Sequence, residues 1–351
     1  MTGETDLKFI HRCLELASRA EGNTYPNPLV GSVIAHEGVI IGEGFHRKAG
    51  EPHAEVVAIE SVGNKELLST STLYVNLEPC SHFGKTPPCA DLIISHNIPR
   101  IVVGTKDTSE KVSGRGIEKL RSSGCSVIAG VAEEECRRIN RRFFTFHEKK
   151  RPYITLKWAE SSDGFLDINR SSESAAGINW ITGKPERILV HKWRASEQSI
   201  LVGAGTVRID DPELNVREWK GSNPLRVILC GSGRLPEDIA MIHSEGSTII
   251  FTCFPEKINL PDVIPVKLND HELAALQISN FLYESDLQSL LIEGGRQVLE
   301  HFITSGIWDE ARVFRGKTKF GEGIKAPEIR GTSYLKQEFS SSSLEIIIND
   351  K

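Results

Sequence analysis

Apolar residues recur with two different periods along the first 150 residues. Near the N-terminus they follow helical spacing (Leu7, Ile10, Leu14 and Ala17), which predicts a helix over residues 6–20. Short apolar runs then predict strands at "LVGSVIA", "GVIIGEGFH", "STLYVNL" and "RIVVGT", the first two as a hairpin. Helical stretches lie between and after them, at "HAEVVAIESV", "CADLIISHN", "GIEKLRSSG" and "VAEEECRRINRRFFTF". Strands alternating with helices predict a three-layer α/β domain.

The pattern changes at the charged run from Glu148 to Arg151, which Pro152 follows. Short apolar strands resume after it, several of them ending in glycine, at "YITLKWA", "SILVGAGTV", "LRVILCG", "STIIFTC" and "SLLIEGG". They predict a second α/β unit, so we expect domains over residues 1–147 and 148–351. The alternative is a surface loop inside one domain, but 351 residues exceed the usual size of one domain.

Composition narrows the class of protein. The chain is 39% hydrophobic and 25% charged, as in ordinary globular proteins. Its net charge of −5 gives no reason to expect nucleic-acid binding. We find no apolar run near the roughly 20 residues of a membrane span, and the N-terminus does not read as a secretory signal. Seven scattered cysteines favour reduced thiols. We therefore expect a cytoplasmic protein without nucleic-acid or membrane partners.

One local cluster of residues indicates a metal-binding catalytic site. "HAE" supplies His53 and Glu55, and "PCSHFGKTPPC" supplies Cys80 and Cys89. An imidazole and two thiolates can hold Zn²⁺ and leave its fourth position open to water. A nearby carboxylate can take that water's proton and pass it to a leaving amine. Together these residues form the signature of the zinc deaminases, in which the glutamate is not a ligand.

Two alternatives for this cluster are a closed structural zinc site and a set of buried thiols. A closed site needs a fourth Cys or His at suitable spacing. His82 is the only such residue nearby, and it lies between Cys80 and Cys89, where we expect it to face the pocket. The added Glu55 and the predicted positions at strand and helix ends favour the catalytic interpretation.

The spacing of the two cysteines narrows the deaminase class. Nucleic-acid and nucleoside deaminases carry Pro-Cys-x-x-Cys, whereas "SHFGKTPP" separates the cysteines here. This loop, "YPNPLVGSVI" and "GEGFHRKAGEPHAEVVAI" resemble the N-terminal domain of the RibD family of riboflavin biosynthesis proteins. The resemblance implies a cytidine-deaminase-like α/β/α fold with one Zn²⁺ on His53, Cys80 and Cys89 and with Glu55 as proton shuttle. It also implies a phosphorylated pyrimidine substrate, which Asn27, His82 and Lys85 would contact.

The residues of the second half, taken without any family resemblance, give weaker evidence for a function. Gly203 and Gly205 follow an apolar strand, as a Gly-rich turn before a polar loop, and a lone Gly-x-Gly is weak evidence for a phosphate site. "LLIEGGRQVLEHF" reads as a buried strand, two glycines and a helix, whose N-terminus can bind an anion. The alternative is a glycine pair needed only for close packing. Neither stretch fits Gly-x-Gly-x-x-Gly, so a Rossmann domain is unsupported.

Four segments of the second half resemble the reductase domain of the same family: "RPYITLKWAESSDG", "WIT", "RASEQSILVGAGTVRIDDPELNVR" and "LLIEGGRQVLEHF". The resemblance implies a dihydrofolate-reductase-like α/β fold that uses NADPH. The implied NADPH-binding residues are Ala159, Trp180, Thr206, Asp210, Gly295, Arg296, Gln297, Val298, Leu299, Glu300 and His301. The implied substrate-binding residues are Arg194, Leu214, Arg217 and Glu293, and Lys157 and Asp163 match positions near the site.

The chain departs from the family pattern at two places in this half. Ile178 stands where the family usually has serine, and Cys230-Gly231 replaces Asp-Ser. The second serine helps to hold the 2′-phosphate of the cofactor in the family, so the preference for NADPH over NADH rests on fewer residues here. Ser232 and Arg234 are candidates to replace it.

The sequence thus predicts a bifunctional enzyme of riboflavin biosynthesis. Its first domain would hydrolytically deaminate 2,5-diamino-6-(5-phosphoribosylamino)pyrimidin-4(3H)-one, and its second would reduce the ribosyl group to ribityl with NADPH. The resemblance also implies a homodimer or homotetramer. One alternative is a zinc deaminase of nucleosides or nucleic acid whose reductase-like domain no longer binds cofactor. Another is a zinc-stabilised scaffold without catalytic activity.

Overall fold

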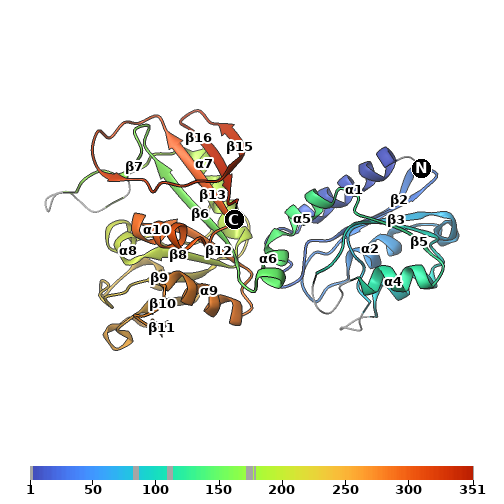
Figure 1. The fold of residues 1–351 in the computed structure, drawn as a ribbon, viewed down its shortest axis with the longest axis horizontal. Helices are drawn as coiled ribbons and strands as arrows, with labels where there is room; N and C mark the ends of the chain where they lie inside the picture. Colours follow the sequence, from blue (N-terminus) through green and yellow to red (C-terminus); the bar gives the residue numbers. More distant parts are fainter. Residues whose placement is uncertain (1–2, 82–86, 109–113, 171–176, 178, 351) are drawn as a thin grey trace. The chain divides into compact units, whose positions relative to one another are not determined.

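The structure is a computed structural model that describes residues 3–81, 87–108, 114–170, 177 and 179–350. The chain forms two compact units, residues 1–150 and 151–351. Each unit has its own sheet (Figure 1).

A five-stranded sheet forms the centre of the first unit, with the order β2-β1-β3-β4-β5 in the described residues. β1 pairs antiparallel with β2, as the predicted hairpin requires, and also with β3. β3, β4 and β5 are parallel, and β3 is buried along its whole length, as parallel strands usually are. The strands are β1 (Gly31–His36), β2 (Val39–Phe45), β3 (Thr72–Leu77), β4 (Arg100–Thr105) and β5 (Ser126–Ala129).

Helices cover both faces of this sheet, because successive strand residues point to opposite sides. Leu73 and Val75 of β3 pack in a core with α2, α3 and α4, whereas Tyr74 packs in a core with α1 and α5. The first unit is therefore a three-layer α/β/α sandwich. Its helices are α1 (Gly3–Ser18), α2 (Ala54–Ser61), η1 (Lys65–Thr70), α3 (Cys89–Ser95), α4 (Arg115–Ser122), α5 (Glu133–Ile139) and α6 (Arg141–Lys149).

The second unit is built on a nine-stranded sheet with the order β11-β10-β9-β8-β12-β6-β13-β16-β15. The strands from β11 to β13 run parallel, and β16 and β15 continue the sheet antiparallel. A small antiparallel pair, β7 and β14, stands apart from it. The strands are β6 (Tyr153–Glu160), β7 (Phe165–Asp167), β8 (Ser199–Gly203), β9 (Leu225–Leu229), β10 (Thr248–Thr252), β11 (Val263–Lys267), β12 (Ser289–Gly294), β13 (Glu310–Gly316), β14 (Ile324–Lys325), β15 (Thr332–Glu338) and β16 (Ser342–Ile348).

Two cores lie on opposite faces of this second sheet. Leu290 and Ile292 of β12 pack with α9 and α10, and Leu291 packs on the other side, with Val207 of α8. The alternation places helices against both faces, as α/β folds require. The helices are α7 (Lys184–Ser196), α8 (Ala204–Asp210), η2 (Ala240–His243), η3 (Pro255–Lys257), α9 (Ala274–Glu284) and α10 (Arg296–Ser305).

Some local details differ from the prediction. Gly203 ends β8 and α8 begins at Ala204, so the predicted Gly-rich turn and the first part of the polar loop form a short helix, whereas residues 211–217 are a loop as predicted. The helical stretch after residue 130 is two helices that meet at Asn140. β5, β7, β11 and the strands after residue 309 have no counterpart in the prediction. Among the described residues, every helix is too short or too polar to cross a lipid bilayer.

Candidate active sites

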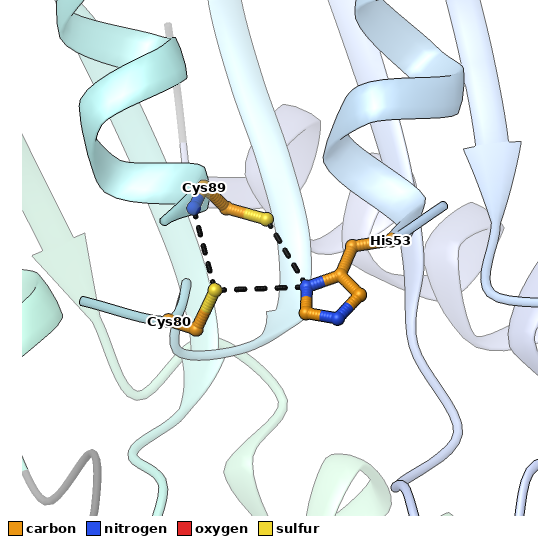
Figure 2. Close-up of side chains that lie close together, drawn as sticks. All are labelled: His53, Cys80 and Cys89. Carbon is orange, nitrogen blue, oxygen red and sulfur yellow. Dashed lines mark hydrogen bonds between the residues drawn. The ribbon is translucent and has the colours of Figure 1, made fainter. Parts of the chain in front are cut away.

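Three donor atoms from distant parts of the first unit lie together in the structure (Figure 2). His53 caps α2, Cys89 begins α3, and Cys80 lies in the loop after β3. His53 Nδ1 is 3.6 Å from Cys80 Sγ and 3.3 Å from Cys89 Sγ. The Cys89 backbone N–H donates to Cys80 Sγ at 3.3 Å. His53 was predicted in the first turn of its helix but is the residue just before it, with extended backbone.

This donor set fits a tetrahedral zinc ion. Zn–S bonds of about 2.3 Å and Zn–N bonds of about 2.0 Å at tetrahedral angles place neighbouring S and N ligands about 3.5 Å apart. The two S–N distances of 3.6 and 3.3 Å bracket that value. Among the residues that the structure describes, three protein donors come together here, which is the number that catalytic zinc sites use.

Glu55 lies in the first turn of α2, beside the donor cluster, and is only 3% exposed. Burial raises the pKa of its carboxyl to about 7, and the neighbouring Cys80 thiolate adds to the shift. A carboxyl with that pKa can both accept and release a proton near neutral pH.

The pKa values of the two thiols shift in opposite directions. Hydrogen bonding from the Cys89 thiol, followed by His53, lowers the pKa of Cys80 to about 4. The same pairing and burial raise the pKa of Cys89. A cation bound between the two sulfurs would favour the thiolate form of both cysteines.

Asn27 belongs to a hydrogen-bonded chain that sequence reasoning did not find. His46 Nδ1 is 3.1 Å from the Pro52 carbonyl oxygen, and its Nε2 is 3.0 Å from Asn27 Nδ2. Since a carbonyl can only accept, Nδ1 carries the proton of the neutral ring and Nε2 accepts from Asn27. The hydrogen bond from Asn27 Nδ2 to His46 thus fixes the orientation of the Asn27 amide, and the amide oxygen can accept a hydrogen bond from another group. His82 and Lys85 lie outside the described residues.

Glu78 is a second residue that the prediction missed. It precedes Pro79 and Cys80 in the chain and is 4% exposed. Its carboxylate accepts from the backbone N–H groups of Asp107, Gly114, Gly116 and Ile117, at 2.8–3.2 Å. The start of α4 is thereby fixed beside the loop that carries Cys80. The signal was present in "LEPC", as a carboxylate at the end of a buried strand.

The second unit contains a cavity of about 950 Å³. It lies where β8, β9, β10 and β12 end, as is usual for ligands of parallel sheets. The predicted cofactor residues that line it are Ala159, Trp180, Thr206, Asp210, Gly295, Arg296, Gln297, Val298 and His301. Leu299 lies instead in the hydrophobic core, and Glu300 pairs with Arg296 at 2.7 Å.

The glycine pair before α10 serves both backbone geometry and close packing. Gly295 has φ +70°, a conformation that favours glycine. A Cβ at Gly294 or Gly295 would lie 3.1 or 3.3 Å from Thr206 Oγ1. Gly295 also lines the cavity, as do the first three residues of the ten-residue α10, where the backbone N–H groups of a helix have no partner within the helix. These features fit the phosphates of a dinucleotide.

A buried charge cluster lies near the same sheet edge. Glu293, at an irregular register between β12 and β8, receives two hydrogen bonds from Arg194, from Nε at 2.8 Å and Nη2 at 2.7 Å. Lys157 Nζ is 3.8 Å from Glu293 Oε2 and lines the cavity. Although burial opposes ionisation, the cations of Arg194 and Lys157 lower the pKa of Glu293 to about 2. Burial lowers the pKa of Lys157.

The other predicted substrate residues follow α8. Leu214 is buried with φ +53°, and Arg217 is exposed. Asn215 joins both arginines: its carbonyl accepts from Arg194 Nη1 at 3.2 Å, and its side-chain oxygen accepts from Arg217 Nη1 at 2.8 Å. Asp163 is a turn residue that accepts from the Phe320 and Gly321 backbone. Ile178 lies outside the described residues.

Comparison with known families gives each unit a class. Residues 3–105 match the cytidine and deoxycytidylate deaminase zinc-binding region, and residues 152–344 match the RibD C-terminal domain. The chain is therefore an enzyme that joins a zinc-binding deaminase domain to a reductase domain.

Relatives that match nearly the whole chain define the family. The riboflavin biosynthesis protein RibD of Aquifex aeolicus is 40% identical over 94% of this chain and 92% of its own length. A Thermotoga maritima structure, a diaminohydroxyphosphoribosylaminopyrimidine deaminase/5-amino-6-(5-phosphoribosylamino)uracil reductase, superposes with a TM-score of 0.89 at 38% identity, covering 99% of both chains. Acinetobacter baumannii RibD gives a TM-score of 0.88 at 31% identity over 100% of both chains.

The chain belongs to the RibD family of riboflavin biosynthesis proteins. The predicted family, the α/β fold class and the pairing of deaminase with reductase are thereby confirmed.

Proposed function

We propose that the first unit deaminates 2,5-diamino-6-(5-phosphoribosylamino)pyrimidin-4(3H)-one, and that the second reduces the ribosyl group of the product to ribityl with NADPH. The observation that carries the proposal is the convergence of His53, Cys80 and Cys89 beside the buried Glu55. The relatives add support, because the Thermotoga maritima protein carries both activity names.

His53, Cys80 and Cys89 would hold one Zn²⁺. Bound there, the ion supplies a nucleophile near neutral pH by lowering the pKa of a coordinated water toward 7. The protein's part is to keep both sulfurs and His53 Nδ1 as neighbours. The loop after β3 and the starts of α2 and α3 place these three atoms together.

Glu55 is the proposed proton shuttle. Its carboxylate accepts a proton from the attacking water and delivers it to the leaving nitrogen. One C–O bond forms at the 2-carbon of the pyrimidine, the C–N bond breaks, and ammonia leaves. The pKa of about 7 places Glu55 in the range where both transfers are efficient.

Asn27, His82 and Lys85 are the proposed substrate contacts in the first unit. For Asn27 the support is its fixed orientation: since its nitrogen donates to His46, its oxygen remains to accept a hydrogen bond from the pyrimidine. For His82 and Lys85 the support remains the family resemblance of their loop.

In the second unit, the cavity is the proposed NADPH site, with the residues named above as its walls. NADPH supplies a hydride when bound. Gly295 and the start of α10 would receive its phosphates, and Gly231 and Ser232 line the same cavity, where a serine of the family is missing. Arg194, Leu214, Arg217 and Glu293 would bind the substrate, the two arginines taking its phosphate.

Hydride addition at C1′ of the ribose needs a proton on the departing ring oxygen. Asp210 is a better donor for it than Glu293. Burial and the neighbouring Asp167 raise the pKa of Asp210, which lines the cavity. Glu293 stays ionised because its pKa lies near 2.

The test is an assay of the purified chain on the diaminopyrimidine phosphate. Ammonia release followed by NADPH oxidation is expected, with one zinc per chain. NADH in a parallel reaction measures the cofactor preference, and light scattering tests the proposed homodimer or homotetramer. A chain that releases ammonia but binds neither nicotinamide cofactor would overturn the reductase half of the proposal.

A further inference from the structure

His191 lies outside every set of residues assigned above, yet it touches the proposed phosphate-binding segment. It is on α7, one turn before Arg194, and is 5% exposed. Its Nδ1 lies 3.3 Å from the backbone nitrogen of Arg217. A buried imidazole is therefore in contact with the main chain of one proposed substrate residue and on the same helix as another.

The hydrogen bond from the Arg217 backbone N–H fixes the tautomer of His191. A backbone N–H can only donate, so Nδ1 must accept, and the proton of the neutral ring is on Nε2. Burial first, and then the charges of Arg194 and Arg217, lower the pKa of His191 and keep the ring neutral. A protonated ring would carry hydrogen on Nδ1 and lose this contact.

α7 holds the segment from Leu214 to Arg217 at two points. Arg194 Nη1 donates to the Asn215 carbonyl, and His191 accepts from the Arg217 N–H. The first contact is anchored in turn, because Arg194 also binds Glu293 through two nitrogens. The second contact is made by His191, and next to it the Val216 N–H donates to Asn223 Oδ1 at 2.8 Å. The Arg217 side chain is 51% exposed, and its Nη1 lies 2.8 Å from Asn215 Oδ1 and 3.5 Å from Glu213 Oε2.

We propose that His191 is a positioning residue of the reductase unit: its Nδ1 holds the main chain of Arg217 so that the guanidinium groups of Arg194 and Arg217 meet the same phosphate of the substrate. The inference rests on the proposed reductase substrate. It assigns to His191 neither contact with the substrate nor proton transfer.

Two amide substitutions of His191 test whether the position of the hydrogen-bond acceptor matters, rather than the size of the side chain. The amide of asparagine occupies the place of Nδ1, whereas that of glutamine reaches the place of Nε2. His191→Asn therefore retains an acceptor for the Arg217 N–H, and His191→Gln does not. Lys184→Gln, at the exposed start of the same helix, is the control for changes on α7.

The experiment is steady-state kinetics of the reductase reaction on the full chain, supplied with the deaminated substrate. His191→Gln should raise KM for the pyrimidine phosphate by roughly three- to tenfold, the effect of one lost hydrogen bond, with kcat and the KM for NADPH little changed. His191→Asn and Lys184→Gln should stay near wild type. Deamination by the same samples and their thermal melting show that the variants are folded.

The outcomes distinguish this inference from the proposed function. Wild-type protein without NADPH oxidation on this substrate would overturn the proposed function itself. An active wild type with equal KM values in His191→Asn and His191→Gln would overturn the positioning role. A fall in kcat alone would overturn it too, because it would place His191 in the chemistry rather than in binding.

Discussion

The two units build their sites in different ways. In the first unit, three donor atoms within 4.8 Å of one another come from His53, Cys80 and Cys89, with Glu55 two residues after the first of them. In the second, a cavity of about 950 Å³ is bounded by residues from Lys157 to Ile324, many of them glycines or apolar side chains. A metal site needs particular atoms, and a dinucleotide site needs a shaped space and free backbone groups. Single substitutions should therefore affect the two units very differently.

The largest contrast should come from removing one metal donor. Cys89→Ala leaves two protein ligands, and even partners outside the ligand shell typically contribute 10–100-fold to metal affinity. We expect zinc content and deamination to be lost. The reductase reaction on the deaminated substrate should continue at the wild-type rate. Metal analysis and the two separate assays measure this, and Cys125→Ala, which removes a partly buried thiol of the first unit outside the donor cluster, is the matched control.

Glu55→Gln also separates the two units, because it removes the proposed proton shuttle of the first unit and keeps the proposed zinc ligands. Deamination should fall roughly 100- to 10,000-fold, the usual contribution of a general acid–base group. Zinc content and NADPH oxidation should not change. Unaltered deamination would indicate a different proton carrier, and a zinc-loaded wild type that releases no ammonia would indicate a zinc-stabilised scaffold.

The difference between a metal site and a dinucleotide site also decides how much of each site the sequence predicts. The spacing of "HAE" and "PCSHFGKTPPC" predicts the metal cluster, since ligand chemistry restricts residue type. The links from His46 to Asn27 and from Glu78 to α4 were missed, because hydrogen bonds between distant segments leave no periodic signal.

In the second unit, the strand and helix around Gly295 were predicted from local pattern, and most cofactor residues came only through family resemblance. The turn expected at Gly203 and Gly205 is mostly a helix, since the requirement there is close packing: a Cβ on Gly203 would lie 2.8 Å from Val298. β15 was missed because every residue of this edge strand is exposed, so it lacks a buried face to reveal it.

Glu293→Gln should affect the stability of the second unit and leave the first unit unchanged. It leaves Arg194 and Lys157 without their carboxylate, and breaking a buried ion pair costs about 3–5 kcal/mol of unfolding free energy. Urea unfolding at pH 7 measures this. Glu300→Gln, which breaks the exposed pair with Arg296, should cost less than about 1 kcal/mol.

The pH dependence of this effect has a definite sign. The folded pKa of Glu293, near 2, lies below the ordinary value of 4.5. Its contribution is therefore complete above pH 4.5 and is lost as the pH falls from 4.5 toward 2. The stability difference between wild type and Glu293→Gln should shrink over that range. A difference that stays constant down to pH 2 would contradict the charge cluster as its cause.

The smallest expected effect concerns backbone shape. Gly295→Ala places a Cβ at φ +70° and 3.3 Å from Thr206 Oγ1. Strain of about 1–2 kcal/mol at this position should weaken NADPH binding by roughly tenfold, measured by fluorescence titration. Gly306→Ala, at the other end of α10, is the matched control, because Gly306 has φ +71° and no atom lies within 4 Å of its added Cβ. Equal binding by both variants would show that the conformation of Gly295 does not shape the cofactor site.

The most direct test of the zinc site is X-ray absorption at the zinc edge of the purified protein. We predict two sulfur neighbours at about 2.3 Å and two nitrogen or oxygen neighbours at about 2.0 Å, from His53 and water. A shell of four protein donors, or a protein that does not retain zinc after purification in its presence, would contradict an open catalytic site at His53, Cys80 and Cys89.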